Sequence, residues 1–310
     1  MSKMAFTSKY ASTCQDAIES LDDRLVIHTY DDYKGKPAVR VSDSTKENDL
    51  KYASILSTPP MAVRWEDLSG MGNFQSQFAQ EKHQAKYSAT LTVGKLDVLQ
   101  DASEAEALEE WQEQWFTAME ALEKRVLKHM FDTNMCPKKK KAVVQSAKKA
   151  VARMRSAAAK DISNDDPEML DMALDAWYDG ANRVISNDRD TDAKQFKAKA
   201  KVFVRDYDNK DANAEKINMV GIVDVATDTV LNKDNNDDKY VHRGDLVGVD
   251  FQLKPYILPS GVYGISVNLR KLHLIQKGEG GGGGGKRKRK VNYGACVKEE
   301  PSMKRTKTDI

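Results

Sequence analysis

The first hundred residues alternate between hydrophobic and polar positions in short segments, which is typical of β-strands. Segment 24–30 is rich in β-branched residues and ends at the turn signal Asp31-Asp32, and segment 38–41 follows a Gly-Lys-Pro sequence. The two segments predict a β-hairpin over residues 24–41. Segments 61–65 and 87–93 alternate in the same way, so each predicts a strand with one buried face.

From residue 108 the hydrophobic period changes from two to between three and four, which indicates amphipathic helices. Apolar residues recur with this spacing from Leu108 to Met130, so the sequence predicts a long helix there. A second helix is predicted over about 141–160, with valine and alanine on one side and cations on the other. A third begins at Asp166-Pro167-Glu168, where proline occupies the favoured first turn.

Strand patterns return after residue 194, in segments 201–205, 219–225, 245–253 and 263–272. In the last two, alternation predicts that Asp250, Gln252, Asn268 and Arg270 lie on the exposed face. The order of strands, helices and strands favours an α+β fold, which we interpret as an OB-like β-barrel or sheet with a helical insertion. The predicted parts are an irregular lead-in over 1–20, one OB-like domain over 21–276 with its insertion at about 103–190, and a disordered Gly-rich, basic tail over 277–310.

Charge is sorted into blocks along the chain, although the net charge is only +2. Residues 277–310 contain ten Lys or Arg and four acids, a charge of +6, which leaves −4 for the rest. Residues 138–160 contain nine basic residues and no acid. Blocks of this kind mark contact surfaces and tails more often than cores.

Several functional classes find no support in the sequence. No apolar run approaches the roughly 20 residues that cross a bilayer, and the N-terminus has no secretory signal, so we expect no membrane association. Three widely spaced cysteines predict neither a disulfide framework nor a zinc site, which favours a reducing compartment. The sequence contains no phosphate-binding loop, dinucleotide fingerprint, nucleophile elbow or His-Glu-x-x-His motif. We therefore expect a protein without enzymatic activity, cofactor or metal.

Cations and aromatic residues are interleaved in the predicted strands. Cations neutralise phosphates, and aromatic rings stack on the exposed bases of single strands. The same rings could instead belong to the hydrophobic core, with the neighbouring cations at its edge. The candidate nucleic-acid-binding residues are Arg64, Trp65, Tyr87, Lys201, Phe203, Arg205, Lys254, Tyr256 and Arg270.

Two further basic segments are candidates for contact with a partner. The second helix presents Lys141, Lys148, Lys149, Arg153 and Arg155 on one side, for nucleic acid, for a protein partner or for solvent alone. In the tail, a polyglycine stretch precedes the run Lys286, Arg287, Lys288, Arg289 and Lys290. This run resembles a nuclear localisation signal, which predicts a nuclear location and a nuclear import receptor as partner, and it would also add affinity for DNA.

The segment order and the stretches 87–93, 249–253 and 265–275 resemble a known family. They are similar to the single-stranded-DNA-binding proteins of nucleocytoplasmic large DNA viruses, of the poxvirus phosphoprotein type. The resemblance covers about a third of the chain and implies an OB-type barrel that holds single strands during replication, recombination and repair. We also expect replication proteins as partners, and for a viral source the nuclear location predicted from the basic run would be the host nucleus. Acidic tails occur in several replication-type single-strand binders, whereas the tail here is basic.

These observations predict sequence-tolerant binding of single-stranded DNA, in an oligomeric state that the sequence leaves open. The second hypothesis is a structural or scaffold nucleoprotein that grips duplex DNA or RNA through its basic blocks. The third is a metal-dependent nuclease, which would need several of the scattered aspartates to converge on one site.

Overall fold

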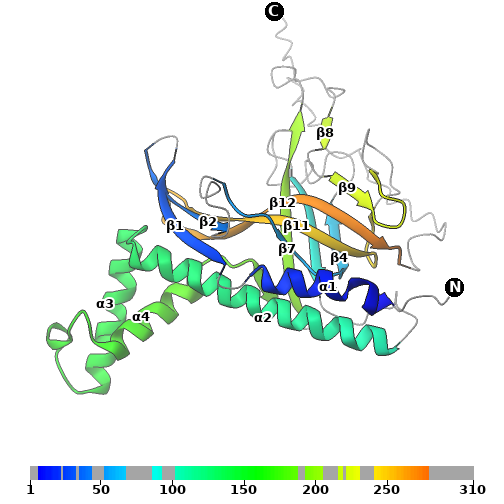
Figure 1. Ribbon diagram of the computed structural model, residues 1–310. Coiled ribbons are helices and arrows are strands. Elements are labelled where there is room, and N and C mark those ends of the chain that lie inside the picture. Colours follow the sequence, from blue (N-terminus) through cyan, green and yellow to red (C-terminus); the bar gives the residue numbers. More distant parts are fainter. Residues whose placement is uncertain are drawn as a thin grey trace, which may run out of the picture.

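The computed structural model describes residues 6–21, 24–32, 35–43, 52–67, 86–92, 102–187, 193–204, 216–218, 221–230 and 241–278. Within these residues, the predicted mixed α+β class is confirmed: helices and β-sheets share one fold (Figure 1). The helices are α1 (Phe6–Glu19), α2 (Ala102–Asp132), α3 (Pro137–Met154), the 3-10 helix η2 (Ala159–Asp161) and α4 (Pro167–Asp179).

The strands fall into a separate hairpin and one large sheet. The hairpin pairs β1 (Leu25–Asp31) with β2 (Pro37–Asp43), as the alternation predicted. The strands of the large sheet are β3 (Leu56–Ser57), β4 (Met61–Asp67), β5 (Lys86–Thr92), β6 (Ile185–Asn187), β7 (Lys194–Val204), β8 (Lys216–Asn218), β9 (Gly221–Asp224), β10 (Thr229–Val230), β11 (Leu246–Ile257) and β12 (Tyr263–Gln276).

The large sheet follows the order β10-β9-β12-β11-β4-β5-β7-β6, with β3 beside β11 and β8 beside β7. One additional parallel pair, Asn268 with Lys199, connects β12 to β7. The strands β12, β11, β4, β5 and β7 therefore lie on a path that returns to its start. Since a single residue pair makes this return among the described residues, the predicted closed barrel is not shown.

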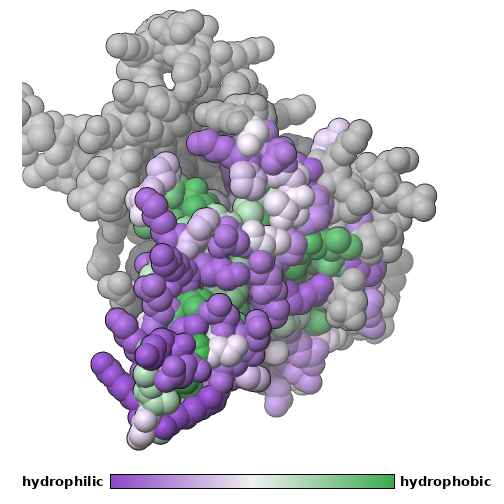
Figure 2. Space-filling model, turned by 90° about the vertical axis from the view of Figure 1, so that its left-hand side faces the viewer, coloured by the Kyte–Doolittle hydropathy of each residue, from purple (hydrophilic) through white to green (hydrophobic). Residues whose placement is uncertain are grey.

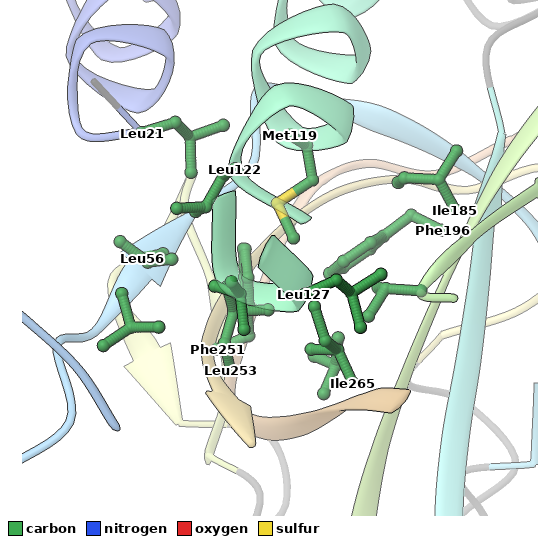
Figure 3. Close-up of a cluster of buried hydrophobic side chains, with 14 of the residues drawn as sticks. Leu21, Leu56, Met119, Leu122, Leu127, Ile185, Phe196, Phe251, Leu253 and Ile265 are labelled. Atoms are coloured by element: carbon green, nitrogen blue, oxygen red, sulfur yellow. The ribbon is translucent and has the colours of Figure 1, made fainter. Parts of the chain in front are cut away.

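Helix α2 carries the side chains that hold the helices and the sheet together. Trp115 is completely buried and meets Phe116, Phe196 and Phe251 edge to face, with ring centroids 5.3, 5.1 and 6.1 Å apart. Its indole Nε1 also donates to the carbonyl of Ser57, at 3.0 Å. In Figure 3, Met119 of α2 lies on the side of Phe196, and Leu122 lies near Leu21 and Leu56. The helical insertion thus fills the core of the sheet.

The insertion begins and ends at neighbouring strands. The Thr92 hydroxyl, at the end of β5, donates to the carbonyl of Lys194, where β7 begins. The sheet resumes at β6, earlier than the boundary near residue 190 that we predicted. Between these points α2 runs along one side of the sheet, and α3, η2 and α4 project beyond it (Figure 1). We call residues 137–179 the helical arm.

Aromatic and backbone contacts fix the helical arm to the sheet. Trp177 of α4 stacks on Tyr263 of β12, with ring centroids 4.0 Å apart, and its Nε1 donates to the carbonyl of Leu127. The backbone of Asn182 then pairs with β12 so closely that a Cβ atom on Gly264 would lie 2.2 Å from the Asn182 oxygen. Only glycine fits at this junction.

The last described residues are held by a buried carboxylate. Asp245 is completely buried and accepts hydrogen bonds from Lys277 Nζ at 3.0 Å and from the backbone nitrogen of Gly278 at 2.9 Å. A Cβ atom on Gly278 would lie 2.6 Å from the carbonyl oxygen of Gly244. The backbone of Asp245 also accepts from Val63 of β4. The point from which residues 279–310 continue is therefore fixed beside β4.

Among the helices, three boundaries differ from the sequence prediction. Residues of the predicted irregular lead-in form α1, whose buried Cys14 and Ala17 are too small to give a clear hydrophobic period. Helix α3 begins at Pro137, because proline is favoured in the first turn rather than excluded from it. It ends at Met154, since Ser156 has a positive φ of 51°. None of the helices in the described ranges is long and apolar enough to span a membrane.

We predict that Trp115→Ala lowers the free energy of unfolding by about 3–5 kcal/mol, because it removes a buried ring from between the helices and the sheet. Guanidinium chloride denaturation followed by circular dichroism measures this loss. Trp111→Ala is the matched control, since Trp111 is only partly buried, at the edge of a smaller cluster. Equal losses for the two variants would contradict the central role of Trp115.

Candidate nucleic-acid interface

Strand β7 has one apolar and one basic side. Phe196 and Ala198 are completely buried, and Lys197 between them is exposed. Successive strand residues point to opposite faces, so the backbone places Lys197, Lys199 and Lys201 on one side of the strand. Phe203 follows at the next position on this side. The burial of Phe196 therefore determines which side of β7 carries the lysines.

The register of β4, β5 and β7 places further residues on the same side. Thr90 of β5 pairs with Trp65 on one flank and with Lys197 on the other. Lys86 pairs with Lys201. Directly paired residues lie on the same face of a sheet. We call this side of the sheet the basic sheet face, defined by backbone register alone, and its positions are Trp65, Asp67, Lys86, Ser88, Thr90, Lys197, Lys199, Lys201 and Phe203. Of the side chains that the structure describes there, Lys197 is exposed and Thr90 is buried.

A bulge in β4 brings Trp65 to the basic sheet face. Val63 pairs with Leu91 and Trp65 pairs with Thr90, so Arg64 is an extra residue between the two pairs. Simple alternation would place Trp65 on the buried side with Val63, and Arg64 outside. With the bulge, the backbone positions of Trp65 and Lys197 both pair with Thr90, and Arg64 is partly buried.

The hairpin of β11 and β12 continues this surface. Asn268 of β12 pairs with Lys199 of the basic sheet face and, on its other side, with Gln252. Lys254 and Arg270 are exposed, and the Arg270 Nε donates to the Gln252 side-chain oxygen at 2.8 Å. The Tyr256 hydroxyl accepts a hydrogen bond from Asn182 at 2.7 Å. The predicted outer positions of this hairpin are thus confirmed as exposed or partly buried, and several make internal hydrogen bonds.

Asp250 is held as a carboxylate at the edge of this surface. Burial raises the pKa of this carboxyl group. Hydrogen bonds from His273, 2.9 Å away, and from Ser57, 2.7 Å away, lower the pKa, and the net shift is downward. The Ser57 hydroxyl donates to the carboxylate rather than to the histidine. The three residues therefore do not form the nucleophile–base pair of a hydrolase. Within the described ranges, no group of three His, Cys, Asp or Glu side chains is arranged to hold a metal.

The cations of the predicted basic helix fall into two groups, those that contact other residues of the helical arm and those that are exposed to solvent. Lys148 donates to the carbonyl of Ile162, and Arg155 forms ion pairs with Asp166 and Glu168. These two side chains hold the helical arm together. Lys141, Lys149 and Arg153 are exposed.

The remaining candidates are separated from the basic sheet face or lie outside the described residues. Tyr87 pairs with Ala200, so the register places it on the opposite face, with the buried Ala89. Arg205 and the run Lys286–Lys290 lie outside the described residues. The sequence analysis missed Lys86, Lys197 and Lys199. The alternating lysines of 197–201 were a usable signal, but we began that strand at residue 201.

No protein-family model matches the chain, and no curated protein matches it in sequence. Among solved structures, it is similar to gp2.5, a single-stranded DNA binding protein encoded by bacteriophage T7. The TM-score is 0.38 at 11% identity, over 72% of this chain and 92% of that one. It is also similar to the single-stranded DNA-binding protein of bacteriophage Enc34, solved alone (TM-score 0.34, 10% identity, 86% and 99% covered) and with single-stranded DNA (0.34, 11%, 73% and 88%). These matches do not support the poxvirus-type family that the sequence resembles. At this level of similarity, the function must be inferred from the chain's own residues.

We predict that the Asp250 carboxyl titrates below 3.8, the ordinary value, in a carbon-13 NMR titration. Because the pKa is lower in the folded state, the ionised carboxylate stabilises the fold above this value, and that contribution is lost as the pH falls through the folded pKa. The stability advantage over Asp250→Asn should shrink in the same range. Ser57→Ala should move the midpoint upward, and a midpoint above 3.8 would contradict the assignment.

Proposed function

We propose that the chain binds single-stranded DNA, without strong sequence preference, on the basic sheet face. The observation that carries the proposal is the alignment of Trp65, Thr90 and Lys197 across three paired strands. The backbone register supports the proposal, because it assigns an aromatic position and three lysine positions of β7 to the same side of the sheet. Stacking on bases and pairing with phosphates are the two contacts that sequence-tolerant single-strand binders combine.

The exposed residues of the neighbouring hairpin extend the proposed path. Lys254 and Arg270 add two exposed cations, and Tyr256 a partly buried ring, on the strands that follow β7 through the Asn268–Lys199 pair. The order β12-β11-β4-β5-β7 with this return is consistent with the strand path of a small barrel. We therefore interpret the sheet as an OB-like barrel whose outer surface binds the single strand of DNA.

The cellular setting is part of the proposal. We propose a binding protein without catalytic activity or cofactor, which acts in replication, recombination or repair of viral type and contacts replication proteins. The basic run Lys286–Lys290 suggests import into the nucleus through an import receptor. The scaffold hypothesis differs because it places all binding in the basic blocks and needs no aromatic residue.

The first test is a salt-titrated competition between a labelled poly-dT strand and a matched duplex. We expect the full chain to prefer the single strand, and a chain that ends at Gly278 to keep this preference. Equal binding to both nucleic acids, or a single-strand preference that is lost with residues 279–310, would favour the scaffold hypothesis instead.

We predict that Lys197→Glu, Lys199→Glu and Lys201→Glu together lower poly-dT affinity about tenfold or more at moderate salt. The slope of log affinity against log salt should fall by about 2, since each lost phosphate contact contributes about 0.7. The matched control reverses Arg24, Lys36 and Lys124, which are exposed and carry the same total charge. An equal loss in the control would show that net charge alone determines binding.

We predict that Trp65→Ala lowers poly-dT affinity about fivefold or more, because base–aromatic stacking contributes about 1–3 kcal/mol per base. Trp65→Phe, which keeps a stacking ring, should retain most of the affinity. Quenching of tryptophan fluorescence by poly-dT, compared between the parent chain and Trp65→Phe, reports the same contact. Unchanged affinity in Trp65→Ala would rule out stacking at this position.

A further inference from the structure

Helix α3 carries a group of exposed cations along one of its faces. Lys138, Lys141, Lys149 and Arg153 are all exposed, and none has an ion pair among the described residues. Their spacing places them on one face of the helix, over about 22 Å at a rise of 1.5 Å per residue. We call these four residues the α3 cation row.

Neighbouring cations do pair with acids, whereas the α3 cation row forms no ion pair with any residue that the structure describes. Arg155, next to the end of α3, pairs with Asp166 at 2.6 Å and with Glu168. Lys148 donates to the carbonyl of Ile162 at 2.8 Å. These contacts fix α3 against the rest of the helical arm and leave the α3 cation row facing outward. Figure 2 looks onto this side of the molecule, where hydrophilic side chains predominate and apolar patches are small and separate.

The chemistry of the α3 cation row favours duplex DNA over a single strand. The exposed residues between the cations are Ala142, Gln145 and Ser146, so the row offers phosphate contacts and no aromatic ring for a base. Duplex DNA carries one negative charge per roughly 1.7 Å of axis, twice the density of one strand. A rigid helix face about 22 Å long also suits a partner that is itself a stiff rod.

We propose that the α3 cation row binds the phosphate backbone of duplex DNA, while the basic sheet face holds a single strand. The chain then recognises the junction where a duplex opens into a single strand. This inference rests on the proposed function for its single-stranded half. The duplex half depends only on the helical arm, so the two halves can fail separately.

The test compares three labelled substrates of equal length: poly-dT, a blunt duplex, and a duplex with a single-stranded poly-dT overhang. The full chain should bind the overhang substrate at least about tenfold more tightly than either of the others, since two linked contacts act together. In the full chain, Lys141→Glu, Lys149→Glu and Arg153→Glu should remove this advantage and weaken duplex binding about tenfold. Poly-dT affinity should stay within about twofold of the parent chain. The corresponding glutamine variant should show the same loss to a smaller degree.

The controls separate the row from general charge. Reversal of Arg24, Lys36 and Lys124, which are exposed residues outside α3, should leave the overhang advantage in place. The variant with Lys197, Lys199 and Lys201 reversed should lose poly-dT binding and retain duplex binding. Circular dichroism and a thermal melt confirm that each variant is folded.

Several outcomes would overturn the inference. Equal loss of poly-dT and duplex binding in the α3 variant would make the helix part of the single-strand site. Unchanged duplex binding would show that the row does not contact DNA. A second copy of the chain is the competing partner, because α4 presents the exposed acids Asp171, Asp175 and Asp179. A mass that rises with concentration in the parent chain but not in the α3 variant, with duplex binding unaffected, would identify that partner instead. Failure of poly-dT binding alone would refute the proposed function and leave the duplex half standing.

Discussion

The contact of Trp115 with Phe196 and Phe251 is the interaction on which the rest of the structure depends. The indole ring comes from the long helix of the insertion, whereas the two phenyl rings come from strands β7 and β11, which both follow that helix in the sequence. Sheet and helices therefore cannot form their cores separately, and the insertion is part of one folding unit. Because Phe196 must face this cluster, the alternate positions of β7 are directed to the other side. The basic sheet face is thus a consequence of core packing.

Long periodic elements were predictable from the sequence, and local irregularities were not. The helix from Leu108 to Met130 and the β1–β2 hairpin follow from hydrophobic period and turn residues alone. Both strands of the β11–β12 pair were likewise recognisable from their alternation. Helix α1 escaped prediction because its buried side is made of small side chains, which contribute little to a hydrophobic period.

The candidate site was predicted only in part, since its geometry depends on pairing between distant strands. The sequence predicted Lys201 and Phe203 on one side of a strand, but it assigned the lysines at 197 and 199 to no element. The position of Trp65 depends on one extra residue in β4, and a single sequence does not reveal such a bulge. Tyr87 looked equivalent to Trp65 in the sequence, yet the register places the two on opposite faces. Binding surfaces on sheets are therefore determined by register, which depends on the whole fold.

The fixed end of the described chain has a consequence for the basic tail. Asp245 holds Gly278 in place beside β4, and Lys286 lies eight positions further along the chain. A chain segment of this length spans at most roughly 26–29 Å when fully extended. The cluster Lys286–Lys290 therefore starts within a sphere of that radius, centred next to the strand that carries Trp65. A ligand that binds this cluster would be held near β4. The length of the glycine stretch would therefore set the local concentration of that ligand at this part of the protein.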